Sequence, residues 1–138
     1  MTNRAAQAIR ILVIDDQKAM RSIIRNLLAV VDIHHVMEAA DGVEGWKNLL
    51  DRRQPTPDVI ICDLHMQNMD GMEFCNRVRL CKDERIRAIP VLILTGERDK
   101  MSLEVAEQVG ATAVLGKPIS APDLCHQIES AVGFAFIN

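Results

Sequence analysis

Short apolar runs recur along the chain, and each is followed by a segment in which apolar residues return every three or four positions. The clear runs are Ile11–Ile14, Val59–Cys62 and Val91–Leu94, with weaker candidates at residues 34–39 and 111–116. An apolar run without polar alternation indicates a strand covered on both faces, as in a parallel sheet. The intervening three-to-four spacing predicts amphipathic helices.

The predicted helices carry recognisable start and stop signals. The first has an apolar stripe, and the next two begin with Asp41 and Glu44, and with Asp70 and Glu73, at the spacing of a capping box. A fourth helix is expected around residues 102–109, ended by Gly110. A fifth begins at Ser120. The stripe of the first helix consists of Met20, Ile23, Ile24, Leu27, Leu28 and Val31.

Five strand–helix units in succession predict an α/β fold. Right-handed crossovers would wind the helices onto both faces of a five-stranded parallel sheet, giving a doubly wound three-layer sandwich with five helices. A length of 138 residues fits one domain of this kind.

Composition and charge narrow the possible partners. Apolar residues make up 49% of the chain and charged residues 25%, which is typical of a globular protein. A net charge of −3 disfavours nucleic acid and anionic membranes as partners. The longest apolar run, Leu27–Val31, is far shorter than the roughly 20 residues of a membrane span. Without an apolar signal core at the start, we expect a cytoplasmic protein. The four cysteines form no C-x-x-C pair, so a zinc site is not expected.

Polar residues follow four of the five predicted strands. Asp15 and Asp16 follow the first and Asp63 the third, while the fourth ends in Thr95 with Gly96 and the fifth in Lys117 with Pro118. In an open α/β sheet the functional crevice lies beyond the carboxyl ends of the strands. Each residue alone has an ordinary structural explanation, as a helix cap, a strand end or a loop charge. Their joint placement predicts a site.

The chemistry of that predicted site points to a cation and an anion. Clustered carboxylates repel one another unless a positive charge lies among them. They are hard oxygen ligands that suit Mg²⁺, and Mn²⁺ can substitute. Lys117 opposite the acids is explained if an anion with several oxygens also enters. A metal, a cationic side chain and a hydroxyl donor are recurring parts of phosphoryl transfer.

Four ordered motifs, VIDD, DLHMQNMDG, LTG and GKP, resemble those of the receiver domain of two-component response regulators, the CheY-like family. The resemblance covers residues 9–133, which leaves residues 1–8 as an expected flexible extension and 134–138 as a short tail. It implies the strand order 2-1-3-4-5 and a cis bond between Lys117 and Pro118.

The resemblance also implies a function. Asp63 would accept a phosphoryl group from a phosphohistidine of a histidine kinase or histidine phosphotransferase, so the protein would be a phosphoacceptor rather than a turnover enzyme. Asp15, Asp16, Asp63 and the backbone carbonyl of His65 would hold Mg²⁺. Lys117, Thr95 and the amide of Gly96 would contact the phosphoryl group. Output would be binding to a downstream protein or onward phosphotransfer, in a motility-like or phosphorelay role, and a phosphorylation-dependent homodimer is left open.

Two departures from the family pattern keep other functions open. Val114 stands where receivers commonly have Tyr or Phe, and Gln67 where they often have Pro. A pseudo-receiver that binds proteins independently of phosphate is therefore the main alternative. A phosphohydrolase with an aspartyl nucleophile is disfavoured, because such enzymes often place a D-x-D motif after the first strand and carry a cap domain. A flavin binder is disfavoured because acids after the first strand would repel the FMN phosphate.

Overall fold

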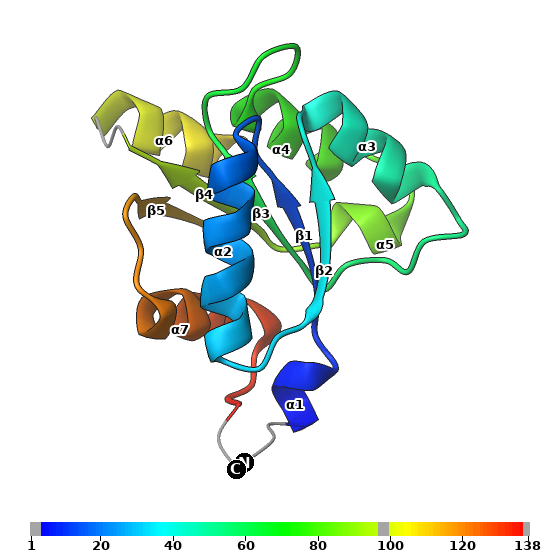
Figure 1. Cartoon of the computed structure of the whole chain (residues 1–138). Coiled ribbons are helices and arrows are strands. Elements are labelled where there is room, and N and C mark those ends of the chain that lie inside the picture. The colour runs from blue at the N-terminus through cyan, green and yellow to red at the C-terminus, as the bar shows by residue number, and fades with distance from the viewer. Residues whose placement is uncertain (1–3, 97–99, 137–138) are drawn as a thin grey trace.

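Five parallel strands form one sheet at the centre of the molecule (Figure 1). The computed structural model describes residues 4–96 and 100–136, with the backbone alone at 100–102. The sheet order is β2-β1-β3-β4-β5, which confirms the expected order and the α/β class. The strands are β1 (Arg10–Ile14), β2 (His35–Ala39), β3 (Val59–Asp63), β4 (Val91–Thr95) and β5 (Ala113–Gly116).

Helices cover both faces of the sheet. The five expected helices are present as α2 (Lys18–Val30), α3 (Gly42–Leu50), α4 (Gly71–Arg79), α6 (Lys100–Gln108) and α7 (Ala121–Val132). Two four-residue helices were not predicted, α1 (Arg4–Gln7) and α5 (Glu84–Arg87), because one helical turn is too short to show an apolar period. The core on one face includes residues of α1, α2 and α7, and the core on the other includes residues of α3, α4, α5 and α6.

The predicted start and stop signals operate as expected. The Asp41 and Asp70 carboxylates accept hydrogen bonds from the backbone amide three residues further on, Glu44 N and Glu73 N, both at 2.8 Å. Ser120 Oγ accepts from Asp123 N at 3.2 Å. Gly110, after α6, has a φ of 94°, a left-handed conformation that favours glycine.

The strands β3 and β4 are buried along their whole length and β1 is buried at Ile11–Ile14, which explains their unbroken apolar runs. Alternate residues of β1 enter opposite cores, Ile11 and Val13 on one side and Leu12 and Ile14 on the other. One prediction about packing is wrong: Ile23, assigned to the inward stripe of the first helix, is 50% exposed. It lies at the border of the stripe, whereas Ile24 and Leu28 are buried.

The packed core extends beyond residues 9–133 at both ends. Ala6 of α1 and Phe136 after α7 are buried in the same core cluster. The Phe136 amide also donates to Glu129 Oε2 at 2.6 Å. The division of the chain into residues 1–8, 9–133 and 134–138 stays a prediction, but the two flanks contribute to the core of this face.

None of the helices in the described ranges combines the length and apolar composition needed to cross a membrane.

Candidate functional site

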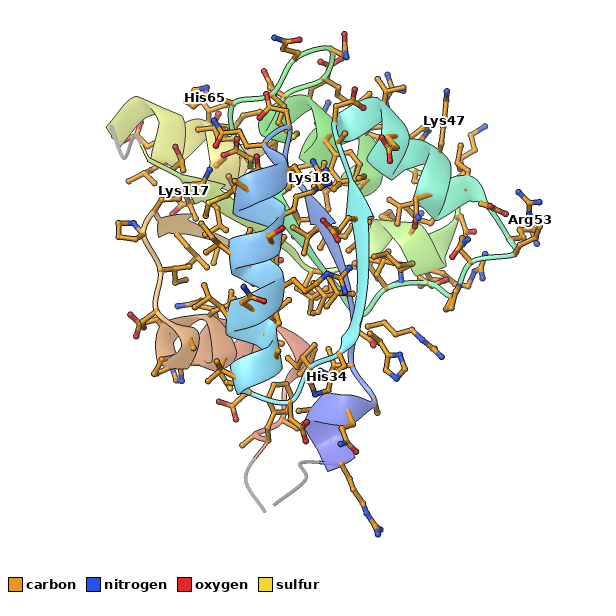
Figure 2. All side chains as sticks on the ribbon, in the orientation of Figure 1. Lys18, His34, Lys47, Arg53, His65 and Lys117 are labelled. Atoms are coloured by element: carbon orange, nitrogen blue, oxygen red, sulfur yellow. The ribbon has the colours of Figure 1, made fainter. Side chains whose placement is uncertain are left out.

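The sheet register brings the predicted site residues to one edge. Ile14 pairs with Cys62 across β1 and β3, so the next residues, Asp15 and Asp63, leave the sheet at the same level. On the other side of β3, Thr95 ends β4 opposite Gly116 of β5, and Lys117 follows directly. Figure 2 places Lys117 and His65 toward this end of the molecule, with His34 at the opposite end.

Three carboxylates cluster at this edge. Asp15, Asp16 and Asp63 each offer an oxygen, and the three oxygens lie within 4.8 Å of one another. Asp15 is 1% exposed and Asp63 9%, whereas Asp16 is exposed. Asp15 Oδ1 accepts a hydrogen bond from Gln17 N at 2.9 Å, but its buried Oδ2 has no hydrogen-bond partner among the described residues.

The Lys117 ammonium lies against the two buried carboxylates. Its Nζ donates to Asp63 Oδ1 at 2.9 Å and lies 3.5 Å from Asp15 Oδ2. The Lys117 amide donates to the Thr95 carbonyl at 2.9 Å, and the bond from Lys117 to Pro118 is cis, as the resemblance implies. Burial alone would lower the pKa of Lys117, but the hydrogen bond and charge of Asp63, with the charge of Asp15, raise it. Lys117 therefore stays protonated.

The buried Asp15 carboxylate is in an unfavourable environment for its charge. Burial raises its pKa, and the nearby charge of Asp63 raises it further, against the opposing effects of the Gln17 amide and Lys117. One ammonium thus does not fully compensate two buried carboxylates. The Oδ2 atom, which faces Lys117 at 3.5 Å but accepts no hydrogen bond from the described residues, and the three converging hard oxygens fit a small divalent cation such as Mg²⁺.

The remaining predicted residues lie around this cluster. Thr95 is 1% exposed at the end of β4, and Gly96 follows at an exposed position. A Cβ placed on Gly96 would meet no atom within 4 Å, so the space beside it is open. His65 is exposed on the loop after β3. The roles of Thr95, Gly96 and the His65 carbonyl stay predictions.

The loop between β3 and α4 is fixed at both ends and in the middle. Gly71 packs so close to Asp63 that a Cβ there would lie 2.5 Å from the Asp63 carbonyl oxygen. Asn68 Nδ2 donates to Asp41 Oδ2 at 3.0 Å, and Met69 is buried against α3. These contacts hold the loop although Gln67 occupies the position where the family often has proline.

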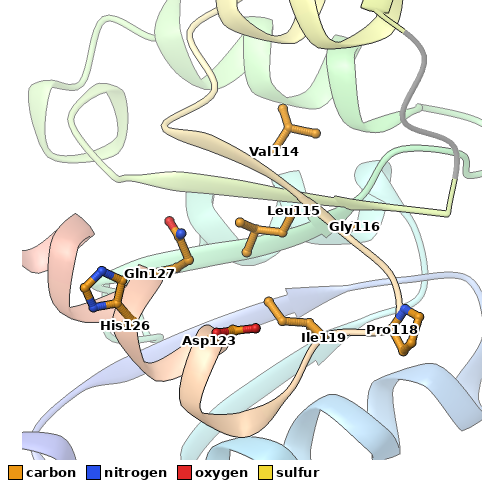
Figure 3. A pocket seen from close by; sticks show the side chains of 8 residues that line it. All are labelled: Val114, Leu115, Gly116, Pro118, Ile119, Asp123, His126 and Gln127. Atoms are coloured by element: carbon orange, nitrogen blue, oxygen red, sulfur yellow. The ribbon is translucent and has the colours of Figure 1, made fainter.

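A hollow borders the site on the side of β5 and α7 (Figure 3). Val114, Pro118, Ile119 and His126 are among the residues that line it. Val114 has no ring, so the position where receivers commonly have Tyr or Phe supplies no aromatic side chain to this hollow.

One contact to the site was not predicted. Arg21 of α2 donates from Nη1 to the Asp15 backbone carbonyl at 2.7 Å. No motif marks Arg21, because the sequence places it among other polar residues of an amphipathic helix. Its partner Glu38 lies on β2, the strand whose end supplies no residue to the predicted site.

The fold and the site together define a class of protein: an α/β domain with clustered carboxylates and an ammonium at the carboxyl edge of its sheet. Comparison with known proteins identifies the family. The family model for the response regulator receiver domain matches residues 11–129. Chemotaxis protein CheY1 of Helicobacter pylori is 34% identical over 124 residues, which cover 90% of this chain and 97% of that protein.

Solved structures of receiver domains are also similar to this chain. A response regulator receiver domain protein from Clostridium thermocellum has a TM-score of 0.79 at 30% identity and covers 91% of this chain and 94% of its own. Chemotaxis protein CheY4 of Vibrio cholerae has a TM-score of 0.77 at 30% identity, covering 89% and 98%. The chain belongs to the CheY-like response regulator receiver domains. Such a domain is a phosphoacceptor rather than a turnover enzyme, and the triad of Asp15, Asp16 and Asp63 is typical of a receiver's Mg²⁺ site.

Proposed function

We propose that Asp63 accepts a phosphoryl group, in a Mg²⁺-dependent reaction, from a phosphohistidine of a partner kinase or histidine phosphotransferase. The supporting observation is the grouping around Asp63: its Oδ1 lies 2.9 Å from the Lys117 ammonium, and its carboxylate lies in the cluster with Asp15 and Asp16. The bond between phosphorus and the donor's ring nitrogen breaks, and a bond between phosphorus and an Asp63 oxygen forms. The donor imidazole, protonated on its second nitrogen, leaves as a neutral ring.

Asp15, Asp16 and Asp63 would hold Mg²⁺, or Mn²⁺ in its place, together with the backbone carbonyl of His65. The bound cation supplies positive charge that offsets the carboxylates and the phosphoryl oxygens. The preference for a hard cation follows from the all-oxygen donor set.

The other residues act on the phosphoryl group. Lys117 lies within hydrogen-bond distance of Asp63, so its ammonium can pair with oxygens of a group attached there. The Thr95 hydroxyl and the Gly96 amide would donate further hydrogen bonds. The open space beside Gly96 leaves room for the group to enter.

Output would follow from the added charge. A phosphoryl group brings about −1.5 to −2 charges to a crevice that already holds three carboxylates. Thr95 and Lys117 reorient toward it, and β5 with the start of α7 moves because Lys117 connects them. The protein then binds a downstream partner or passes the group onward. The likeness to chemotaxis proteins supports motility control, and a phosphorelay is the other role.

A small phosphodonor tests the proposal. The purified protein is incubated with acetyl phosphate and MgCl₂, and intact-mass spectrometry is expected to detect one added phosphoryl group. Asp63→Asn and EDTA should each abolish the adduct. Asp70→Asn is the matched control: it removes one nearby carboxylate but keeps a side chain that caps α4 well, so labelling should persist.

The outcomes separate the alternatives. No adduct with any donor or divalent cation would overturn the proposal in favour of a phosphate-independent interaction module. An adduct that persists in Asp63→Asn would place the acceptor elsewhere. Rapid, repeated hydrolysis of the donor would instead indicate a phosphohydrolase.

A further inference from the structure

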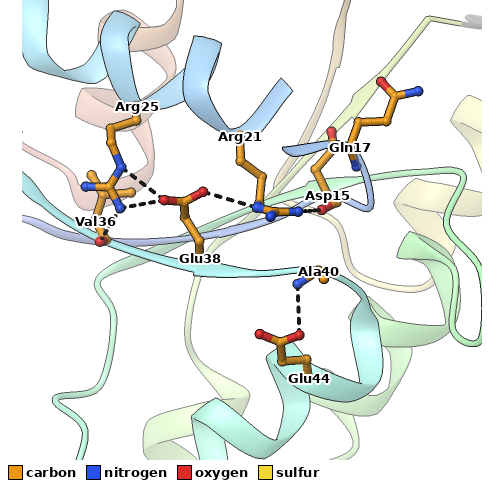
Figure 4. A network of polar contacts seen from close by, with 8 residues as sticks. All are labelled: Asp15, Gln17, Arg21, Arg25, Val36, Glu38, Ala40 and Glu44. Carbon is orange, nitrogen blue, oxygen red and sulfur yellow. Dashed lines mark hydrogen bonds and ion pairs between the residues drawn. The ribbon is translucent and has the colours of Figure 1, made fainter. Parts of the chain in front are cut away.

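A polar network connects the acidic site to β2 through helix α2 (Figure 4). Arg21 is central to it: Nη1 donates to the Asp15 carbonyl oxygen at 2.7 Å, and Nε donates to Glu38 Oε1 at 3.1 Å. The two acceptors belong to neighbouring strands of the sheet or their ends: Asp15 directly follows β1, and Glu38 is the last but one residue of β2. One guanidinium therefore joins the carboxyl end of β1 to that of β2.

Arg25, one helical turn further along α2, shares the same carboxylate. Its Nε and Nη2 donate to Glu38 Oε2 at 3.1 and 2.8 Å, and Nη2 also donates to the Val36 carbonyl at 3.0 Å. Arg25 thus binds β2 as Arg21 does, but its hydrogen bonds go to Glu38 and Val36 and not to Asp15. The Arg21 side chain is 15% exposed and that of Arg25 42%, so the contact to the site is also the better shielded.

The Asp15 carbonyl matters because it belongs to the peptide unit between Asp15 and Asp16. A peptide unit is planar, so fixing its oxygen fixes the directions of the chain at both adjoining Cα atoms. Asp15 N donates to the Ala39 carbonyl at 3.1 Å, which holds the preceding peptide unit. Arg21 holds the following one. Together these bonds set how the Asp15 and Asp16 carboxylates leave the strand.

We propose that Arg21 is a positioning residue of the cation site, oriented for this task by Glu38. Arg21 does not touch the cation or the phosphoryl group and acts through the Asp15–Asp16 peptide. The inference rests on the proposed Mg²⁺ site. A guanidinium is needed because one planar group donates in two fixed directions, whereas lysine offers a single ammonium that cannot span both acceptors.

Cation binding in the absence of any phosphodonor is the primary test. Mn²⁺ affinity is measured by electron paramagnetic resonance and Mg²⁺ affinity by calorimetry, on the full chain. Arg21→Ala and Arg21→Lys should each raise Kd about tenfold, the size of effect found when groups that orient metal ligands are removed. Glu38→Gln should raise it less, because Arg21 keeps its bond to Asp15. Arg25→Ala is the matched control and should stay within about twofold of wild type.

A second measurement needs no cation. Hydrogen exchange of the Asp15 and Gln17 amides, which donate to the Ala39 carbonyl and to Asp15 Oδ1, is followed by NMR in EDTA and should accelerate in Arg21→Lys and stay unchanged in Arg25→Ala. A purely structural role of the network would lower the melting temperature of both variants and leave Kd unchanged. Arg21→Lys keeps the charge and aliphatic stem, so it provides the decisive comparison if Arg21→Ala does not fold.

The results distinguish this inference from the proposed function. If wild-type protein binds Mn²⁺ and Arg21→Lys binds it equally well, the positioning role is overturned while the cation site stands. If wild-type protein binds no divalent cation, the proposed function fails, and the positioning role fails with it.

Discussion

Replacing Asp15 with asparagine tests the electrostatics of the acidic site most directly. Asp15 is 1% exposed, and its Oδ2 has no hydrogen-bond partner among the described residues. Burial, and then the charge of Asp63, raise its pKa above the unfolded value. A carboxyl group with a raised folded pKa favours folding below its unfolded pKa, and that contribution is lost as the pH rises through the folded pKa. At neutral pH the ionised Asp15 therefore destabilises the cation-free protein.

The magnitude of the effect on stability follows from the Asp15 Oδ2 atom, which accepts no hydrogen bond from the described residues. A buried polar atom without a partner costs about 1–3 kcal/mol. The asparagine side chain in Asp15→Asn would carry no charge, and its amide could donate to Asp63. Because Lys117 at 3.5 Å already compensates part of the Asp15 charge, we take the lower end, a gain of about 1 kcal/mol in the free energy of unfolding. For a domain of 138 residues this raises Tm by about 3–5 °C.

Mg²⁺ should make wild type more stable than Asp15→Asn, which reverses their order of stability in EDTA. At a concentration of about 100 times Kd, a ligand adds about 2.7 kcal/mol to the stability of the protein that binds it. Wild type would gain this increment, and Asp15→Asn would lose most of it with the missing ligand charge. Thermal unfolding followed by circular dichroism, in EDTA and in MgCl₂, measures both effects.

Asp16→Asn is the control for the reversal. Asp16 is exposed, so its replacement should change stability in EDTA by no more than about 0.5 kcal/mol, yet it should also remove the Mg²⁺ increment. The reasoning is refuted if Asp15→Asn melts below wild type in EDTA, or if Mg²⁺ raises the Tm of both proteins equally.

Three further predictions concern stability. Hydrogen bonds from Arg25 and, to a smaller extent, Arg21 lower the pKa of Glu38 below its ordinary value, so Glu38→Gln should be less stable than wild type at pH 7. The difference in stability between wild type and Glu38→Gln should disappear as the pH falls below about 4, where Glu38 becomes protonated. Urea titrations at several pH values would contradict this if the difference stayed constant. Gly71→Ala should lower the free energy of unfolding by about 1–3 kcal/mol, because the added Cβ would meet the Asp63 carbonyl. Gly96→Ala, where the added Cβ meets no atom within 4 Å, should unfold like wild type. Equal urea midpoints for the two variants would count against the steric argument. Phe74→Ala should cost about 3–5 kcal/mol by calorimetry, since Phe74 is fully buried, and a loss below about 1 kcal/mol would exclude the assigned packing.

The sequence predicted the parts of the molecule that depend on local signals. Fully covered strands leave unbroken apolar runs, and Asp41, Asp70 and Ser120 precede helices at the spacing that caps require. Because parallel strands end at one edge, residues far apart in the chain could be assigned to one site without coordinates. That argument placed Asp15, Asp63 and the other site residues together.

Contacts between surface side chains and distant backbone left no such signal. Arg79, on the polar side of α4, donates to the Gly110 carbonyl at 2.9 Å and to the Ile89 carbonyl at 2.7 Å. Arg21 of α2 was missed for the same reason, since it donates to the Asp15 carbonyl. A charged residue on an amphipathic helix has the same sequence appearance whether it is solvated or bound to a neighbouring loop. Ile23 shows the converse, since the apolar spacing cannot define the edge of the covered stripe.

The first and last described segments of the chain lie near each other, at the end of the molecule opposite the carboxylate cluster (Figure 1). Ala6 and Phe136 occupy one cluster beneath the start of β1, whereas Asp15 and Asp63 emerge from the far ends of their strands. A fluorophore or a tether to a sensor chip attached at residue 4 or residue 136 would thus stand about a strand length away from the crevice. Capture assays with candidate kinases can be run on such immobilised protein with the crevice facing the solution.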